Sequence, residues 1–323
     1  MLVLVTGATG LVGNNVVRLL LDRGDQVRVL ARSTSDPRPL EGLKVDVFRA
    51  DIQQQEELKR AAEGAQIVVH AAAQISFGWT GLEQARAVNV EGSRNVAKAA
   101  LANGARLVHV SSVDTLSPAS LEQPADEETV GEKIPCSYVV SKREAEEAVR
   151  QQTEQGLDAV IVNPGFMLGP WDWKPSSGRM LIEVGRRFTP LAPVGGVSVC
   201  DVRDVANGIL SAAVKGSTGR NYILAGHNMT YFDAWRLFAK VAGGRGPVGK
   251  MGPLIRTVAG STGDLWTKLT GREGDVNSAA IKMSSLFHCY SSARAEAELN
   301  YHCRPVEQSV EDAWKWFIDN GYV

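Results

Sequence analysis

The 323-residue sequence has few cysteines and almost no excess of charge, and both shortages exclude classes of function. Its four cysteines form no CxxC pair and its five histidines show no close pairing, so no metal site is indicated. Thirty-five basic residues nearly balance thirty-six acidic ones, which argues against a nucleic-acid partner. Four thiols without a disulfide framework are typical of a reducing compartment, and we expect a cytoplasmic protein.

Long hydrophobic runs are also missing. No window approaches 18 uninterrupted apolar residues, so we expect no membrane-spanning helix. The first residues contain neither a basic segment nor an apolar run of signal-peptide length. Glycine, in contrast, is abundant: 32 of 323 residues, or about 10%, compared with roughly 7% in an average protein.

The first half of the chain alternates between short apolar segments and amphipathic ones. The apolar segments, expected to be strands, are 2–5, 26–31, 45–50, 66–72, 105–112 and 157–164, and the expected helices are 11–23, 54–64, 81–104 and 137–156. Such alternation predicts an α/β fold with a doubly wound parallel sheet of the Rossmann type, covered on both faces.

Beyond about residue 165 the alternation becomes irregular. We expect a dinucleotide-binding domain over 1–170 and a smaller C-terminal lobe, mainly for substrate, over 171–323. Segments within about 197–226 are expected to return to the core, because they read as a strand, a helix and a further strand. The stretch 243–253 is the most linker-like.

A glycine-rich turn, TGATGLVG (6–13), joins the first strand to the first helix. Its GxxGxxG spacing is one residue wider than the ordinary dinucleotide fingerprint, but the requirement is the same: a tight turn and a helix N-terminus directed at a pyrophosphate. The candidate cofactor-binding residues of this turn are Gly7, Thr9, Gly10, Leu11, Val12 and Gly13.

The end of the second strand indicates which cofactor is used. An acid usually holds the ribose 2′-hydroxyl of NAD at this point, whereas the sequence here reads Ala31-Arg32-Ser33. The Arg32 guanidinium suits a 2′-phosphate, so NADP(H) is favoured over NAD(H). Two alternatives remain, a solvated surface role for Arg32 and a competing contact from Asp36.

Together with this turn, the motifs NVEGSRN (89–95), VHVSS (108–112), YVVSK (138–142) and NPGFMLGP (163–170) resemble the extended short-chain dehydrogenase/reductase family, of the NAD-dependent epimerase/dehydratase type. The similarity extends over nearly the whole chain. Within the family the sequence is most similar to bacterial members grouped with dihydroflavonol reductases, 3β-hydroxysteroid dehydrogenases and hopanoid-associated sugar epimerases. The resemblance implies a homodimer.

The resemblance implies that Ser112, Tyr138 and Lys142 are the catalytic residues. The chemistry of the residues agrees, because Tyr138 and Lys142 are four positions apart on an expected helix and therefore share one face. A nearby ammonium favours the phenolate and lowers the pKa of a tyrosine, which assists proton exchange with a carbonyl oxygen. Ser112, at the end of the fifth strand, is expected to hydrogen-bond the same oxygen. The alternative is that Tyr138 is a packing residue and Lys142 a solvated charge.

Further cofactor contacts are implied by the resemblance with less support from the residues themselves. They are Asp51 and Ile52, Ala71, Ala72 and Ala73, Asn89, and Pro164 with Gly165. Each has a structural alternative: Asp51 could cap the next helix, the alanines could serve strand–helix packing, and Asn89 could stabilise its own helix.

The substrate is less well determined. Aromatic and basic residues near the expected mouth of the site are candidate substrate contacts, with Ser112: Phe77, Trp79, Phe166, Trp171 and Arg179. They favour a small lipophilic or ring-shaped substrate for a dihydroflavonol reductase-like oxidoreductase, but the aromatic residues could instead seal the interface between the lobes. A nucleotide-sugar epimerase or dehydratase that uses transient hydride transfer is the alternative. A non-catalytic NADP-sensing module is disfavoured, because such relatives have generally lost the tyrosine–lysine pair.

Overall fold

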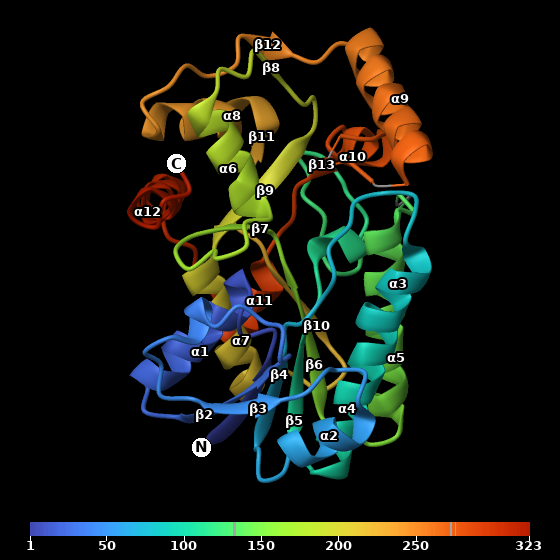
Figure 1. The fold of residues 1–323 in the computed structure, drawn as a ribbon, viewed down its shortest axis with the longest axis vertical. Helices are drawn as coiled ribbons and strands as arrows, with labels where there is room; N and C mark the ends of the chain where they lie inside the picture. The colour runs from blue at the N-terminus through green and yellow to red at the C-terminus, as the bar shows by residue number, and fades with distance from the viewer. Residues whose placement is uncertain (132–133, 272, 275) are drawn as a thin grey trace.

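The computed structural model describes residues 1–131, 134–271, 273–274 and 276–323. Seven parallel strands form the central sheet in the order β10-β6-β5-β4-β1-β2-β3 (Figure 1). These strands are β1 (Leu2–Thr6), β2 (Gln26–Ala31), β3 (Asp46–Arg49), β4 (Ile67–His70), β5 (Arg106–Val110), β6 (Ala159–Pro164) and β10 (Asn221–Leu224). The predicted Rossmann-type parallel sheet is therefore confirmed.

Helices cover both faces of this sheet, which is why its strands are almost continuously apolar. One layer contains α1 (Leu11–Asp22), α7 (Val202–Lys215) and α11 (Ala293–Leu299), and the other contains α2 (Gln55–Ala61), α4 (Gly92–Ala102) and α5 (Ser137–Glu154). In β1, Val3 and Val5 join the core under the first layer, whereas Leu4 joins the core under the second. Successive side chains of a strand point to opposite faces, so one short strand contributes to both cores.

The strand order reverses at β1, which lies between β2 and β4. The chain runs outward from β1 through β2 to β3, and then returns to β4 on the other side. In open parallel sheets the crevice at the carboxyl ends of the strands beside such a reversal is where ligands bind. The turn after β1 and the residues after β4 therefore occupy the expected place for a dinucleotide.

The second lobe is built around a small sheet in which β9 (Gly196–Asp201) pairs with three strands: β7 (Phe166–Leu168), β11 (His227–Thr230) and β13 (Phe287–His288). Its helices are α6 (Ser177–Arg186), α8 (Tyr231–Val241) and α12 (Val306–Asp319), and together with this sheet they enclose an apolar core of their own. Of the segment 197–226, α7 and β10 lie on the central sheet, whereas β9 lies in the small one.

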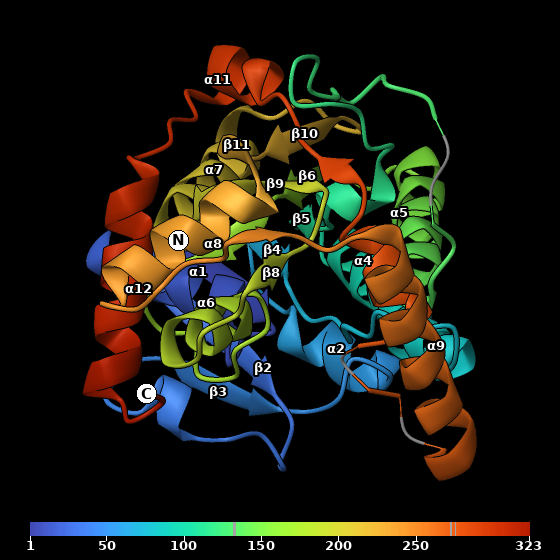
Figure 2. The same cartoon turned by 90° about the horizontal axis from the view of Figure 1, so that it is seen from above.

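The remaining elements form the outer edge of this lobe. A short pair of strands, β8 (Leu191–Ala192) and β12 (Gly249–Lys250), precedes α9 (Pro253–Thr270) and α10 (Ser278–Met283). The linker-like stretch 243–253 thus contains one strand of that pair and leads directly into α9. Seen from above, α9 lies at the periphery of the molecule (Figure 2). Within the part of the chain that the structure describes, no helix has both the length and the apolarity to cross a bilayer.

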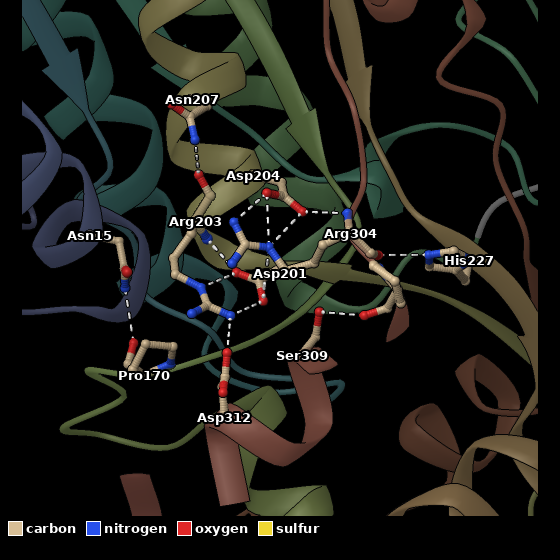
Figure 3. Close-up of polar contacts among 11 residues, drawn as sticks. Asn15, Pro170, Asp201, Arg203, Asp204, Asn207, His227, Arg304, Ser309 and Asp312 are labelled. Carbon is tan, nitrogen blue, oxygen red and sulfur yellow. Dashed lines mark hydrogen bonds and ion pairs between the residues drawn. The ribbon is translucent and has the colours of Figure 1, made fainter. Parts of the chain in front are cut away.

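Ion pairs attach the C-terminal segment to α7 (Figure 3). The Asp201 side chain caps α7 by accepting a hydrogen bond from the Arg203 backbone N–H at 2.8 Å. Arg203 also donates to Asp312 of α12 at 2.6 Å, and Arg304 donates to Asp204 at 2.6 Å. Because these pairs are partly buried, we expect them to fix α12 against the core more firmly than exposed pairs would.

Candidate functional site

The turn after β1 is held in its shape by the sheet itself. Gly7 has a positive φ of 73°, and a Cβ atom there would lie 2.6 Å from the backbone of Ala71 after β4. A Cβ atom on Gly13 would lie 2.3 Å from the Gly7 carbonyl oxygen. Two glycines of the motif are therefore required by internal packing, since any side chain would separate the turn from its neighbours.

Gly10 has a different explanation. A Cβ atom there would approach no group of this chain more closely than 3.4 Å, so internal packing does not require a glycine. Gly10 is the N-cap of α1, it has no side chain to cap the helix, and the first turn contains no acid. The exposed N–H groups and the positive end of the helix dipole fit a pyrophosphate. Of the other residues expected in this turn, Thr9 and Gly10 precede α1, while Leu11, Val12 and Gly13 form its first turn.

The end of β2 leaves Arg32 exposed, while Asp36 is engaged elsewhere. Asp36 accepts three hydrogen bonds from the guanidinium of Arg38, the shortest at 2.6 Å. Arg49, at the end of β3, donates to the backbone carbonyl of Arg32 at 3.1 Å, which adds a second guanidinium beside the first. The acid that could compete for a ribose is thus paired with Arg38, and the guanidinium groups of Arg32 and Arg49 follow the neighbouring ends of β2 and β3.

The other expected cofactor residues line the same edge of the sheet. Asp51 follows β3 and accepts a hydrogen bond from the Gln53 N–H at 2.9 Å, so its carboxylate also supports the turn before α2. Ile52 is buried against Gly92 of α4. Ala71, Ala72 and Ala73 follow β4 directly, Pro164 ends β6, and Gly165 comes next.

Asn89 lies where the expected helix 81–104 is interrupted. The structure contains α3 (Leu82–Arg86), a π-helical turn, η2 (Ala87–Glu91), and then α4. The Asn89 amide donates to the Gln74 carbonyl at 3.0 Å and to the Ser141 hydroxyl at 2.9 Å, while its oxygen accepts from the Gln74 N–H. The wider turn lets Asn89 connect the segment after β4 to α5, an arrangement often found beside functional sites. The single helix predicted here was wrong in this respect.

Tyr138 and Lys142 lie one turn apart on the buried face of α5, directed at the end of β5. The Lys142 ammonium donates to the Val110 carbonyl oxygen at 2.9 Å. Ser112, two residues beyond Val110, hydrogen-bonds the Tyr138 phenol. The three residues expected to act together are therefore brought together, although α5 and β5 are separated by a long polar loop.

Burial dominates the proton affinities of this group. It raises the pKa of Tyr138 above its ordinary value, and the negative charge of Asp114 adds to this effect, while the hydrogen bond with Ser112 opposes it. Burial also lowers the pKa of Lys142 to about 8, against the opposing charge of Glu146. The phenol is thus protonated at neutral pH, and Lys142 changes its charge close to that range.

Three polar residues near the trio, Glu146, Asp114 and His288, were not expected from the sequence to belong to the site. Glu146 accepts hydrogen bonds from the Ser111 and Asn163 side chains, at 2.5 and 2.8 Å. Asp114 accepts from Ser112 and lies 3.4 Å from the His288 ring nitrogen. The spacing 138–142–146 puts Glu146 on the face of α5 that carries the tyrosine and lysine, and this spacing could have identified it.

The expected substrate residues lie on several elements around the two lobes. The Phe77 ring contacts the Tyr138 ring edge-on, with 4.9 Å between centroids, and the Trp79 indole donates to Ser278 at 2.7 Å. Phe166 lies on β7 and Arg179 on α6. Trp171 is stacked under the Arg18 guanidinium at 3.3 Å and belongs to the aromatic cluster of the second lobe. Of these five residues, Phe77 has a ring contact with the catalytic tyrosine.

Comparison with known proteins agrees with this geometry. The family model described as "NAD dependent epimerase/dehydratase family" matches residues 3–225. A Synechocystis sp. protein named dihydroflavonol 4-reductase is 34% identical, covering 99% of this chain and 95% of its own length. Sterol demethylase protein B of Methylococcus capsulatus is 30% identical over the full length of both chains.

Among solved structures, a nucleoside-diphosphate-sugar epimerase from Pseudomonas aeruginosa superimposes with a TM-score of 0.83 at 25% identity, covering 100% of this chain and 99% of that one. The expectation of an extended short-chain dehydrogenase/reductase is confirmed by the family match and by these full-length relatives. The chain belongs to the NAD-dependent epimerase/dehydratase family and is an NAD(P)-dependent oxidoreductase of the extended short-chain dehydrogenase/reductase type.

Proposed function

We propose that the protein catalyses the NADP-dependent interconversion of a ketone and a secondary alcohol on a lipophilic, ring-containing substrate. The observation that carries this proposal is the buried trio: Tyr138 and Lys142 on one face of α5, with Ser112 against the phenol. The phenol is walled by apolar groups, because Phe77 contacts its ring and Met283 of α10 belongs to the same cluster.

Tyr138 acts as the proton donor to the carbonyl oxygen during reduction and as the acceptor in the reverse direction. Its raised pKa keeps the proton on the phenol at neutral pH, as an acid catalyst requires. The Ser112 hydroxyl, which donates to Asp114 in this structure, would turn its one proton to the same oxygen when substrate binds and so orient the carbonyl. Lys142, fixed on the Val110 carbonyl, would hold the nicotinamide ribose, and its positive charge favours the phenolate left after proton transfer. NADPH, when bound, supplies the hydride.

The preference for NADP(H) rests on the end of β2. Arg32 is exposed with Arg49 beside it, and Asp36 is occupied by Arg38. A phosphate with two negative charges gains from both guanidinium groups, whereas an uncharged hydroxyl does not. The glycine turn and Asp51 would bind either cofactor equally well, so they do not distinguish NADP(H) from NAD(H).

We further propose that the enzyme is a cytoplasmic homodimer. All four cysteines are free thiols, which suits a reducing compartment. The paired helices α3–α4 and α5 form the outer layer on one side of the sheet, where an ion pair of Arg86 with Glu144 joins α3 to α5. Dimerisation through this helix layer follows the habit of the family.

The names of the full-length relatives support a ring-shaped substrate, since one is named for a flavonoid and another for a sterol. A nucleotide-sugar epimerase is the second candidate, supported by the full-length likeness to such an epimerase. It would need cationic groups for the diphosphate of the sugar nucleotide. Apart from Lys142, the groups around Tyr138 are apolar or, in Asp114, acidic.

The test is NADPH oxidation with a panel of cyclic ketones, including a dihydroflavonol and a 3-keto steroid, beside thermal shifts with UDP- and GDP-sugars. We expect turnover with a ring ketone and no rise in melting temperature from the sugar nucleotides beyond that given by cofactor. A rise that depends on the sugar moiety, with no ketone turned over, would favour the epimerase.

A further inference from the structure

Helix α9 is amphipathic in the reverse of the usual sense, because its small residues face the protein and its large apolar ones face outward. Gly260 is its one fully buried position among the residues described, and a Cβ atom there would lie 3.1 Å from Ser278 of α10. On the outer face, Leu254 and Leu269 are each 76% exposed and Trp266 is 60% exposed. Core-facing helices normally bury such residues.

The outer residues form one stripe along the helix, interrupted at its middle by the exposed Ser261 and Thr262. Leu254, Val258, Leu265 and Leu269 follow spacings of four, seven and four residues, which places them on a single face of the helix. Trp266 lies beside this stripe. Large apolar side chains exposed together on one helix face indicate an interaction site.

Apolar groups also connect this edge of the lobe to the catalytic tyrosine. The α9 helix packs on α10, and Met283 of α10 belongs to the apolar cluster that contains Tyr138. Trp79, which is partly exposed, hydrogen-bonds Ser278 at the start of α10. Phe77 is 37% exposed and yet contacts the Tyr138 ring. A lipophilic molecule at this edge would therefore meet Trp79, Phe77 and Met283 before the phenol, beside the Glu273 carboxylate that accepts from the Trp79 N–H at 2.8 Å.

The charges on α9 and on the short segment before it indicate what kind of surface covers the stripe. Within 249–271, Lys250 and Lys268 are exposed, and Arg256 is partly buried against Ser285. The one acid in this range, Asp264, accepts a hydrogen bond from the Ser278 N–H at 3.0 Å and so faces α10. Two copies meeting through this face would oppose lysine to lysine, whereas an anionic lipid surface would attract both lysines.

We propose that the outer face of α9 docks on an anionic bilayer surface, with Leu254, Val258, Leu265, Trp266 and Leu269 entering the interfacial region. A helix with an apolar Leu/Trp face and basic neighbours lies in the plane of such an interface. The consequence for catalysis rests on the proposed function: a lipophilic ketone dissolved in the bilayer enters the site past Trp79 and Phe77. The helix is 18 residues long, so the docked segment is a substantial part of the surface of this lobe.

The experiment is flotation of the full-length protein with vesicles of phosphatidylcholine alone or with 30% phosphatidylglycerol. We expect binding to the anionic vesicles that falls at least tenfold in the double variant Leu265→Asp/Leu269→Asp and falls at high salt. Val214→Asp on α7, an exposed apolar residue outside this face, is the matched control and should bind like the parent. Lys250→Glu/Lys268→Glu should reduce binding while leaving the apolar stripe intact. Circular dichroism melting shows whether each variant is folded.

Absence of vesicle binding by the parent protein overturns the proposal. Equal binding by the parent and the Leu265→Asp/Leu269→Asp variant also overturns it. If that variant instead converts a larger assembly to a smaller one in light scattering, without any effect on vesicles, the face joins copies of the chain. None of these measurements uses cofactor or turnover, so failure of the proposed reaction with soluble ketones is a separate result.

Discussion

Ser112 and Asp114 form a reciprocal pair at the end of β5: the serine hydroxyl donates to the aspartate carboxylate at 3.1 Å, and the aspartate N–H donates back to the hydroxyl at 3.2 Å. This pair puts a carboxylate beside the catalytic phenol. The charge of Asp114 raises the pKa of Tyr138, in addition to the larger effect of burial. Asp114 and the Ser112 hydroxyl therefore act in opposite directions on the same proton.

Replacing Asp114 with asparagine should lower the pKa of Tyr138, because the negative charge is removed while the shape is kept. In the reduction direction the phenol must be protonated, so the alkaline limb of the pH–rate profile should move to lower pH by about one unit. In the oxidation direction the phenolate is needed, and the acid limb should move the same way. Because burial places the pKa of Tyr138 above its ordinary value of about 10, initial rates are followed between pH 8 and 12 to measure both limbs. An unchanged profile would show that Asp114 does not act on this proton.

Removing the phenolic oxygen with Tyr138→Phe should abolish turnover without affecting the cofactor. The ring contact with Phe77 remains, so NADPH affinity should stay within about twofold while kcat falls on the order of 100-fold or more, as for loss of a general acid. Calorimetry gives the first quantity and NADPH oxidation the second. Tyr322→Phe, which removes a phenol that bonds the Trp173 carbonyl in the second lobe, is the control. Activity of Tyr138→Phe within tenfold of the parent would exclude it as proton donor.

The Arg32→Ala variant should lose most of its preference for NADPH. A hydrogen bond to a charged group contributes about 1.5–3 kcal/mol, which is roughly ten- to a hundredfold in affinity. NADPH should bind the parent at least tenfold more tightly than NADH, and Arg32→Ala should weaken NADPH alone. Arg49→Ala should have a smaller effect in the same direction. Equal affinities of the parent for the two cofactors, measured by calorimetric titration, would contradict this assignment.

The parts of the site that the sequence predicted are those formed by neighbouring residues or by one helix. Gly7, Gly10 and Gly13 follow an apolar strand within a few residues, and Tyr138 and Lys142 share one helix face, so local spacing is sufficient. The pairing of His288 with Asp114 depends instead on β13 joining β9, a contact between distant segments. No spacing rule along the chain predicts it.

The irregular elements were missed for physical reasons of a different kind. The π-helical turn at Asn89 arises because its amide satisfies the backbone of Gln74, a tertiary contact that overrides local helix preference. Helix α9 has its apolar residues on the outside and Gly260 inside, so a search for a core-facing stripe identifies the wrong face. Arg38 pairs with Asp36, two residues before it, and this short spacing could have predicted the pair from the sequence.

The dimer should appear in light scattering at micromolar concentration as a species of about twice 34.8 kDa. The proposed dimer layer is made of α3, α4 and α5 and does not include the outer face of α9, so Leu265→Asp/Leu269→Asp should leave the mass unchanged. A parent protein that stays monomeric over this concentration range would contradict the proposed homodimer.

Asp172 should make the protein less stable as the pH rises. Its carboxyl group is buried beside Gly178, where a Cβ atom would lie 2.4 Å from the carboxyl oxygen, and burial raises its pKa from 3.8 to about 7, only partly offset by the Gly178 N–H. A raised acid pKa means that the folded state holds the proton more tightly than the unfolded chain. The stabilisation is therefore complete below pH 4 and is lost between pH 4 and 7, by on the order of 2–4 kcal/mol.

Asp172→Asn keeps the shape without the ionisation, so its melting temperature relative to the parent should rise from pH 5 to pH 8. The exposed Asp319→Asn at the end of α12 should show no such trend. Parallel pH profiles for the parent and Asp172→Asn, in thermal melts across that range, would show that the carboxyl is ionised in the folded protein without cost.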